Sequence, residues 1–367
     1  MTILLTPHKD YTKQFENYIE HYKLSGRLFD DREINLKPKH ERSCRFCMKS
    51  HPEVTFKKKA HLIPELLGNK IFFSDFECDQ CNLLFGTYET ELANYLGISR
   101  TLNHAKGKAG IPSFSSPGAS IQARAKFLLN ETAIVVSRKD IGNDEIQIDS
   151  ENGTYTLRIK RNSFVPRKVY QAILKIALSL ISNEQIADYK LTLDFLMNGK
   201  GPLLSGYAIQ GYTLPYGFNL PPHAFLFEKR DESSKRPTHV MALYFQNSIF
   251  ALSIPLNRND IWIYKDAKKL SLELYPPVFT QFTAVDHLQL SPFNEDFSSE
   301  DKVKDSIQEI QFKMDPKSLK NAAVYDSATG ITSVTPFNAK EIVEIVMQEN
   351  TGPVDPAQLF QALRNSK

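Results

Sequence analysis

The chain has 367 residues, of which 41% are hydrophobic and 24% are charged, and its formal net charge is +3. This composition is typical of an ordinary soluble globular protein of two or three domains. No apolar run is long enough to span a bilayer, and no small-residue cleavage site follows the short apolar patch at the N-terminus. These patterns exclude a membrane partner, and we expect a cytoplasmic location.

The chain is predicted to have three parts. Residues 1–42 read as a polar lead-in with one helix at 11–22. Residues 43–118 form a module that holds all four cysteines and ends in a linker rich in Gly, Ser and Pro at 107–118. Residues 119–367 have the texture of a larger mixed domain of strands and helices, so the expected fold class is α+β.

Several elements are predicted inside the larger domain. A helix opens at Pro166, with apolar residues at helical spacing as far as Leu180 and with Lys168 and Lys175 off this stripe. Further helices are expected at 184–197 and 339–347, whereas 294–320 is charged and less patterned. The predicted strands are 122–127, 133–137, 145–148, 155–159, 224–228, 240–245, 249–254 and 260–264.

The cysteines occur as two CxxC pairs. Cys44 and Cys47 form the first pair, and Cys78 and Cys81 form the second, with 30 residues between them. Disulfides are rare in a reducing cytoplasm, whereas two such pairs can supply four thiolates to one tetrahedral zinc ion. The alternative is four ordinary buried cysteines. The spacing favours a zinc site with a folded segment inside the gap.

Positive charge is concentrated in the same module. Between Lys37 and Lys70 there are nine Lys and Arg residues against three Glu. Such an excess attracts phosphates, although a charge run alone is equally typical of a solvated face. The cluster at Lys57, Lys58 and Lys59 is the first candidate for nucleic-acid binding.

Between the cysteine pairs lies a segment with a recognisable order of residues. His61 is followed by two apolar residues and Pro64, then by a Gly68–Asn69 turn, and Asn82 directly follows the second pair. In this order the sequence resembles the zinc-knuckle branch of the HNH, or ββα-metal, endonuclease family. The resemblance covers residues 44–86 and implies a small zinc-stapled ββα module that cuts nucleic acid.

The resemblance also implies a role for each matched residue. His61 matches the general base that activates water, and a neutral imidazole near neutral pH suits that task. Asn82 matches a ligand of the catalytic divalent ion, Mg²⁺ or Mn²⁺. Asn69 matches the middle Asn that braces the loop, with Asp75 as the alternative. The zinc would be structural, because four thiolates leave no open coordination position.

One departure from the family pattern concerns the catalytic ion. Most members carry an acidic residue or His before the base, where this chain has Ala60, and Gly86 does not supply the His that some branches use. Either the ion is held by Asn82, the substrate phosphate and water, with help from Glu77 or Glu89, or the site only binds. Because the base and Asn82 are both present, we expect an active enzyme.

A second basic segment follows the module. Arg100, Lys106 and Lys108 surround a flexible glycine and are candidates to clamp the phosphates that flank the cut. A solvated linker is the alternative.

The expected function is metal-dependent hydrolysis of phosphodiester bonds by an HNH endonuclease. DNA is expected rather than RNA because most of the family acts on DNA, and restriction or phage defence is the expected setting by analogy. The alternatives are a non-catalytic zinc-dependent nucleic-acid-binding protein and a protein–protein adaptor. The role of 119–367 is left open between target recognition, sensing of an activating ligand, and formation of a homo-oligomer.

Overall fold

The computed structural model describes residues 5–29, 36–128, 131–139, 145–149, 152–199, 208–214, 221–260, 274–279, 289–313, 322–325, 332–335, 344–347 and 362. The chain divides into two compact units. The first unit combines Met1–Ala93 with Phe164–Lys302, and the second combines Asn94–Ser163 with Val303–Lys367. The chain is therefore grouped differently from the three consecutive parts expected from the sequence.

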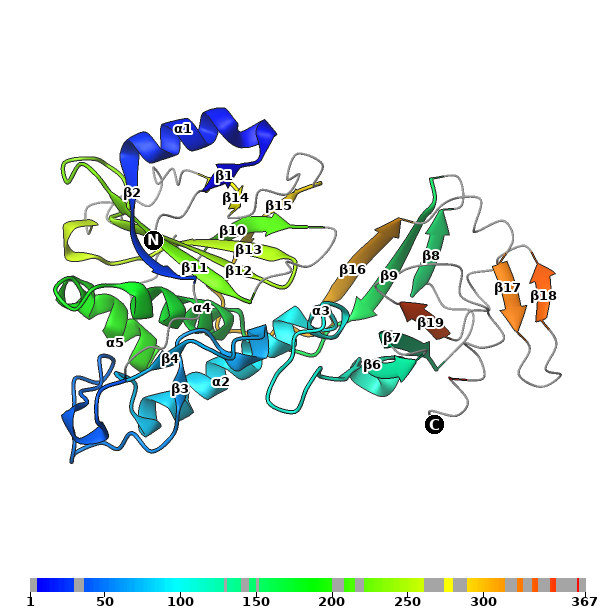
Figure 1. The fold of residues 1–367 in the computed structure, drawn as a ribbon, viewed down its shortest axis with the longest axis horizontal. Helices are drawn as coiled ribbons and strands as arrows, with labels where there is room; N and C mark the ends of the chain where they lie inside the picture. Colours follow the sequence, from blue (N-terminus) through cyan, green and yellow to red (C-terminus); the bar gives the residue numbers. More distant parts are fainter. Residues whose placement is uncertain are drawn as a thin grey trace. The chain divides into compact units, whose positions relative to one another are not determined.

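The first unit is built on a six-stranded sheet in which the strand order is β15-β10-β13-β12-β11-β2 (Figure 1). All neighbouring strands in this sheet are antiparallel. Strand β2 comes from the predicted lead-in, so that segment is an integral part of the sheet. The strands are β2 Tyr22–Leu28, β10 Ala208–Thr213, β11 His223–Lys229, β12 His239–Phe245, β13 Ser248–Ser253 and β15 Ser291–Asp296.

Helices cover both faces of this sheet. Figure 1 shows α1 (Thr12–His21) on one side and α4 (Pro166–Leu180) with α5 (Lys190–Asn198) on the other. On β11, Phe225 and Phe227 belong to the aromatic cluster beneath α1, whereas Leu226 points to the opposite face. The central strands are therefore buried on both sides, which explains their nearly continuous apolar sequences.

Smaller elements complete the first unit. A two-stranded pair joins β1 (Thr6–Pro7) to β14 (Val278–Phe279). The short 3₁₀ turns are η1 Lys9–Tyr11, η2 Lys39–Glu41, η3 Glu65–Leu67, η5 Ile186–Tyr189 and η6 Arg258–Asp260. Among the described residues, no helix combines the length and the apolar character that a membrane crossing would need.

The cysteine module adopts the expected ββα arrangement within the first unit. Strands β3 (Ala60–His61) and β4 (Phe73–Ser74) pair antiparallel, and helix α2 (Asp79–Leu96) follows. The Tyr88 hydroxyl on α2 donates to the Leu196 carbonyl at the end of α5, 2.9 Å away. The module is therefore packed on the helices beneath the large sheet.

The second unit contains two small sheets that share one hydrophobic cluster. Its members come from both sheets and include Ile121, Val136, Leu157 and Ile159. The sheet orders are β19-β7-β6-β5 and β16-β9-β8, and β17 pairs with β18. The elements are α3 Ser99–Leu102, η4 Pro117–Ala119, β5 Phe114–Ser115, β6 Ile121–Leu128, β7 Glu131–Arg138, β8 Ile146–Asp149, β9 Thr154–Lys160, β16 Ile307–Lys313, β17 Ala322–Tyr325, β18 Thr332–Thr335 and β19 Glu344–Met347.

Two sequence predictions for the C-terminal third are wrong. Residues 294–320 were expected to be charged and less patterned, with no strand assigned, but β15 extends to Asp296 and β16 forms within this span, because Ile310 and Phe312 alternate into the cluster. The helix expected at 339–347 is a strand over Glu344–Met347, which pairs with β7. Residues 339–343 lie outside the described residues, as do residues 261–264 of the strand expected at 260–264.

Candidate active site

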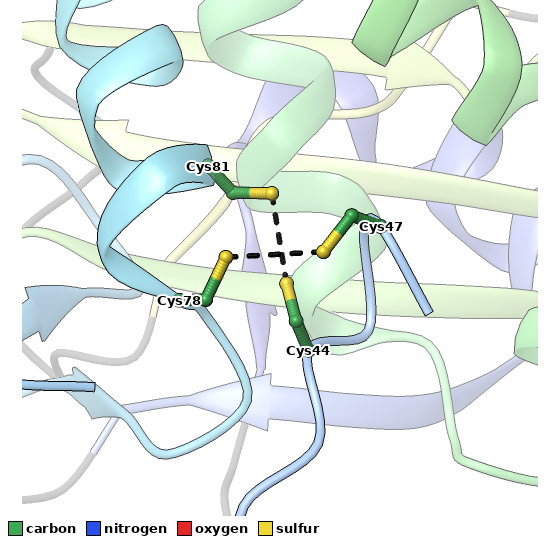
Figure 2. Close-up of side chains that lie close together, drawn as sticks. All are labelled: Cys44, Cys47, Cys78 and Cys81. Carbon is green, nitrogen blue, oxygen red and sulfur yellow. Dashed lines mark hydrogen bonds between the residues drawn. The ribbon is translucent and has the colours of Figure 1, made fainter. Parts of the chain in front are cut away.

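The four cysteine side chains converge on one point. Cys78 and Cys81 project from the start of α2, Cys44 and Cys47 project from the facing loop, and the sulfur atoms face a common centre (Figure 2). All four sulfur atoms lie within 4.8 Å of one another. The sulfur atoms of Cys44 and Cys81 are 3.6 Å apart, and those of Cys47 and Cys78 are 3.8 Å apart. A zinc tetrahedron with Zn–S bonds of about 2.3 Å has edges of about 3.8 Å, so the cluster fits zinc.

The pKa values of the cysteine thiols are also consistent with a cation bound at this centre. The hydrogen bond between Cys44 and Cys81 lowers the pKa of Cys44 to about 5, although burial opposes the shift. The same hydrogen bond, together with burial, raises the pKa of Cys81. Without a bound cation, deprotonation of all the neighbouring thiols therefore costs free energy. A divalent ion removes that conflict because it binds thiolates directly.

His61 stands at the end of β3 and opens a tightly folded loop. The loop turns at Gly68, whose φ of +101° places it in the left-handed region that glycine adopts without strain. Asn69 is fully buried, and its Oδ1 accepts from the backbone amides of Ile71 and Phe72, 3.0 and 2.9 Å away. Its Nδ2 donates back across the loop, to the carbonyls of Ile63 and Phe72, and lies 3.4 Å from His61 Nδ1.

Asn69 therefore ties the loop to itself beside the His61 ring. The alternative brace, Asp75, instead accepts a hydrogen bond from the backbone amide of Lys37. A buried side chain that satisfies both ends of a loop restricts its conformations, which keeps the neighbouring ring in place.

The His61 ring is shielded but accessible, with 23% of its side chain exposed. Burial lowers the pKa of His61 below its ordinary value, although the Glu65 carboxylate, 3.9 Å from Nε2, opposes the shift. Three lysines add to the lowering: Lys175, Lys59 and Lys70. The imidazole is therefore neutral at neutral pH, the form that can accept a proton.

The face of α2 that carries Asn82 is open. Asn82 is half-buried, and a Cβ atom added at Gly86, one turn further on, would meet no described atom within 4 Å. Ala60 is 1% exposed and has no ligand atom. Of these positions, only Asn82 has a side-chain oxygen that can bind a divalent ion, so its role as a ligand stays a prediction.

The two acidic residues considered as extra ligands have different surroundings. The Glu77 side chain is 1% exposed and forms an ion pair with Lys175, so it does not reach a solvent-accessible ion. Glu89 lies two turns beyond Asn82 on the same face of α2, and burial raises its pKa to about 7, although Lys175 opposes the shift. Of the two, Glu89 stays a candidate.

Comparison with known proteins identifies the module. A family model for the HNH endonucleases matches residues 44–91, which include both cysteine pairs, His61, Asn69 and Asn82. Residues 44–91 form an HNH endonuclease module. At the family level the chain therefore contains a nuclease-type domain. Neither the search of curated proteins nor the search of solved structures gave a match.

Lysines on the HNH module are held close to the His61 strand. The Asp79 carboxylate, at the start of α2, accepts from the backbone amides of Lys57 and Lys58 at 2.9 and 2.8 Å. Both lysines are exposed, and Lys59 Nζ lies 3.4 Å from the centroid of the Phe73 ring. The Asp79 carboxylate thus links the start of α2, beside the second cysteine pair, to the loop that carries Lys57 and Lys58, called the basic loop below.

The second group of predicted phosphate contacts belongs to the other unit. Arg100 is partly buried in α3, this burial lowers its pKa, and its contact with nucleic acid stays a prediction. Lys106 and Lys108 are exposed. Their contact with nucleic acid stays a prediction.

Two residues of the site were missed by the sequence reasoning. Asp79 could have been noticed, because an acidic residue at a helix start commonly accepts nearby backbone amides. Lys175 was expected off the apolar stripe of α4, but its burial was not foreseen: its side chain is 2% exposed and pairs with Glu77 of the HNH module. No local signal marks it, because its partners come from the HNH module.

Proposed function

We propose that the chain is a metal-dependent endonuclease that hydrolyses phosphodiester bonds of DNA. The observation that carries this proposal is the neutral, partly exposed His61 imidazole, braced by Asn69 inside a module of the HNH family. An imidazole held in this state can act on a bound water as soon as the substrate arrives.

In this reaction His61 accepts a proton from water, and the resulting hydroxide attacks phosphorus. The bond from phosphorus to the leaving oxygen then breaks, and that oxygen takes up a proton from water, which gives one end with the phosphate and one with a hydroxyl group. The Glu65 carboxylate, 3.9 Å from His61 Nε2, stabilises the imidazolium that forms. Asn69 keeps the ring in place during the transfer.

The divalent ion would be held by Asn82, the substrate phosphate and water. When bound, it neutralises charge that builds up on phosphorus oxygens. An ion with so few protein ligands binds weakly, so activity should need about millimolar Mg²⁺ and should rise with Mn²⁺, which accepts looser geometry.

The substrate is held by charge rather than by shape. Lys57 and Lys58 are exposed, and their backbone is fixed by Asp79 near the His61 strand. Lysines in such a loop bind backbone phosphates without reading sequence. Restriction or phage defence, a homo-oligomer, and an activating ligand on the rest of the chain stay predictions.

The rival function is nucleic-acid binding without cleavage, and the absence of a ligand atom at Ala60 favours it. The experiment is incubation of supercoiled plasmid and of a structured RNA of similar length with Mg²⁺, Mn²⁺ or EDTA. We expect the plasmid to be cut with either metal and to stay intact in EDTA. Retarded but uncut plasmid under all conditions would favour the rival, and cleavage of the RNA alone would contradict the choice of DNA.

A further inference from the structure

The ammonium group of Lys175 is a buried charge of the first unit that the proposed reaction does not use. It projects from α4 into the HNH module, where its side chain is 2% exposed and Nζ lies 2.9 Å from Glu77 Oε2. Taking two charges out of water costs several kcal/mol per ion unless geometry and hydrogen bonds compensate. Such a pair therefore contributes little net stability and is better explained by the structure that it fixes.

Lys175 contacts both halves of the ββα motif. Its Nζ donates to the backbone carbonyl of His61 at the end of β3. The same atom pairs with Glu77, directly before α2, and lies 5.9 Å from the centroid of the Phe85 ring on that helix. One ammonium thus holds the strand that carries His61 against the helix that carries Asn82.

We propose that Lys175 is a positioning residue for the nuclease reaction, which sets the place of the His61 imidazole through the His61 carbonyl oxygen. This inference rests on the proposed role of His61 as general base. Lys175 is buried and so does not contact nucleic acid. Its removal should reduce the rate of the chemical step and leave substrate binding unchanged.

A second effect of Lys175 is electrostatic. The charged groups that face His61 are Glu65 from η3, Lys59 and Lys70 from the flanks of the loop, and Lys175 from α4. Behind Lys175 lie Glu77 and Glu89. The positive charge of Lys175 lowers the pKa of His61, after burial and against Glu65. Without that charge, the imidazole would take up a proton at higher pH.

The test uses Lys175→Arg and Lys175→Met in the full chain, with Lys168→Met on the same helix as the matched control. The steady-state rate of cleavage with Mn²⁺ is measured over a range of plasmid concentrations from pH 5 to 8, which gives kcat and KM. For Lys175→Met we expect kcat to fall about 10- to 100-fold with KM unchanged, as displacement of a catalytic group by about 1 Å commonly causes. We also expect the acid limb of its rate profile to move to higher pH.

Lys175→Arg keeps the charge but not the geometry. The kcat of this variant should fall, whereas the acid limb of its pH–rate profile should lie at the same pH as in wild type. The pKa of His61 is measured directly from the Cε1–Hε1 signal in NMR, assigned by its loss in His61→Ala. The Glu89 carboxyl group titrates in the same pH range, so Glu89→Gln shows which part of the acid limb is due to Glu89.

Zinc content and far-UV circular dichroism show whether each variant is folded. If Lys175→Met does not fold, Lys175→Met/Glu77→Gln removes both charges of the ion pair and should show the same loss of kcat. Folded variants with the kcat and acid limb of the wild type would overturn the inference. Failure of the proposed function looks different, because then His61→Ala cuts as fast as wild type.

Discussion

The guanidinium of Arg45 lies 2.8 Å from the carbonyl oxygen of Ile181, at the C-terminal end of α4. The same Nη1 atom is 3.1 Å from the carbonyls of Leu178 and Ser179, and Nη2 donates to Asn183. The last carbonyls of a helix have no partners inside it, and a cation there is favourable. The first cysteine pair therefore caps the helix that carries Lys175.

Replacing Arg45 should destabilise the first unit as a whole. Arg45→Ala leaves the three carbonyls of α4 without their donor, and hydrogen bonds to charged groups contribute about 1.5–3 kcal/mol each. We expect the free energy of unfolding in urea to fall by about 2 kcal/mol or more. Arg42→Ala, which removes one exposed hydrogen bond to the Lys37 carbonyl, is the control and should change it little. Equal effects of the two variants would contradict the capping role.

Zinc should be required for the fold of the HNH module. We expect about one zinc ion per chain by elemental analysis, and Cys78→Ser should lose it and lower the midpoint of thermal unfolding. The reason is that structural zinc contributes much of the folding free energy of small modules. Ser43→Ala, an exposed change beside Cys44, is the control. Wild-type protein without zinc but with an unchanged midpoint would contradict this prediction.

The parts of the fold that the sequence revealed are those with strong local patterns. Helix α4 was predicted from the helical spacing of its apolar residues, and strands β11 to β13 were predicted from their short runs of apolar residues. Strand β2 was missed because only Tyr22 of its residues is fully buried and its pairing with β11 is set by backbone hydrogen bonds. Glu344–Met347 was wrongly assigned to a helix, because its strand state depends on β7, about 200 residues earlier.

The site was predictable to a similar degree. The cysteine spacing predicted the cluster, and the four sulfur atoms confirm it. The order of His61, Asn69 and Asn82 predicted the HNH module, and the family match confirms that assignment, while the roles of these residues stay predictions. Lys175 could not be found in this way, because its carbonyl partner lies 114 residues away in the chain.

The basic loop should account for part of the salt dependence of DNA binding. The double variant Lys57→Ala/Lys58→Ala removes two phosphate contacts, and each contact contributes about 0.9 to the slope of log K against log salt concentration. We expect the slope to decrease by about 1.8 in a fluorescence-anisotropy titration. Lys9→Ala/Lys13→Ala, with the same charge change near α1, should keep the wild-type slope. Equal slopes for both double variants would show that the loop does not contact phosphates.

Restoring a carboxylate at position 60 should strengthen metal binding. Ala60→Asp adds a ligand where Asn82 is the only one offered by the motif positions, and we expect the Mg²⁺ concentration for half-maximal cleavage to fall by about tenfold. Because Ala60 is 1% exposed, the added charge should also lower the midpoint of thermal unfolding when no metal is present. Addition of Mn²⁺ should restore that midpoint. Ala60→Asn, neutral and of the same shape, is the control. An unchanged metal requirement for Ala60→Asp would mean that another residue supplies the ligand.

The central claim is that His61 acts as the general base of a metal-dependent nuclease. The most direct measurement is the single-turnover rate of plasmid cleavage in Mn²⁺ for His61→Ala beside His51→Ala, an exposed His of the same module. We predict that His61→Ala loses about 10²- to 10⁴-fold in rate, with zinc content and DNA affinity unchanged, and that His51→Ala cuts as wild type does. A folded, zinc-bound His61→Ala protein that cuts at the wild-type rate would contradict the claim.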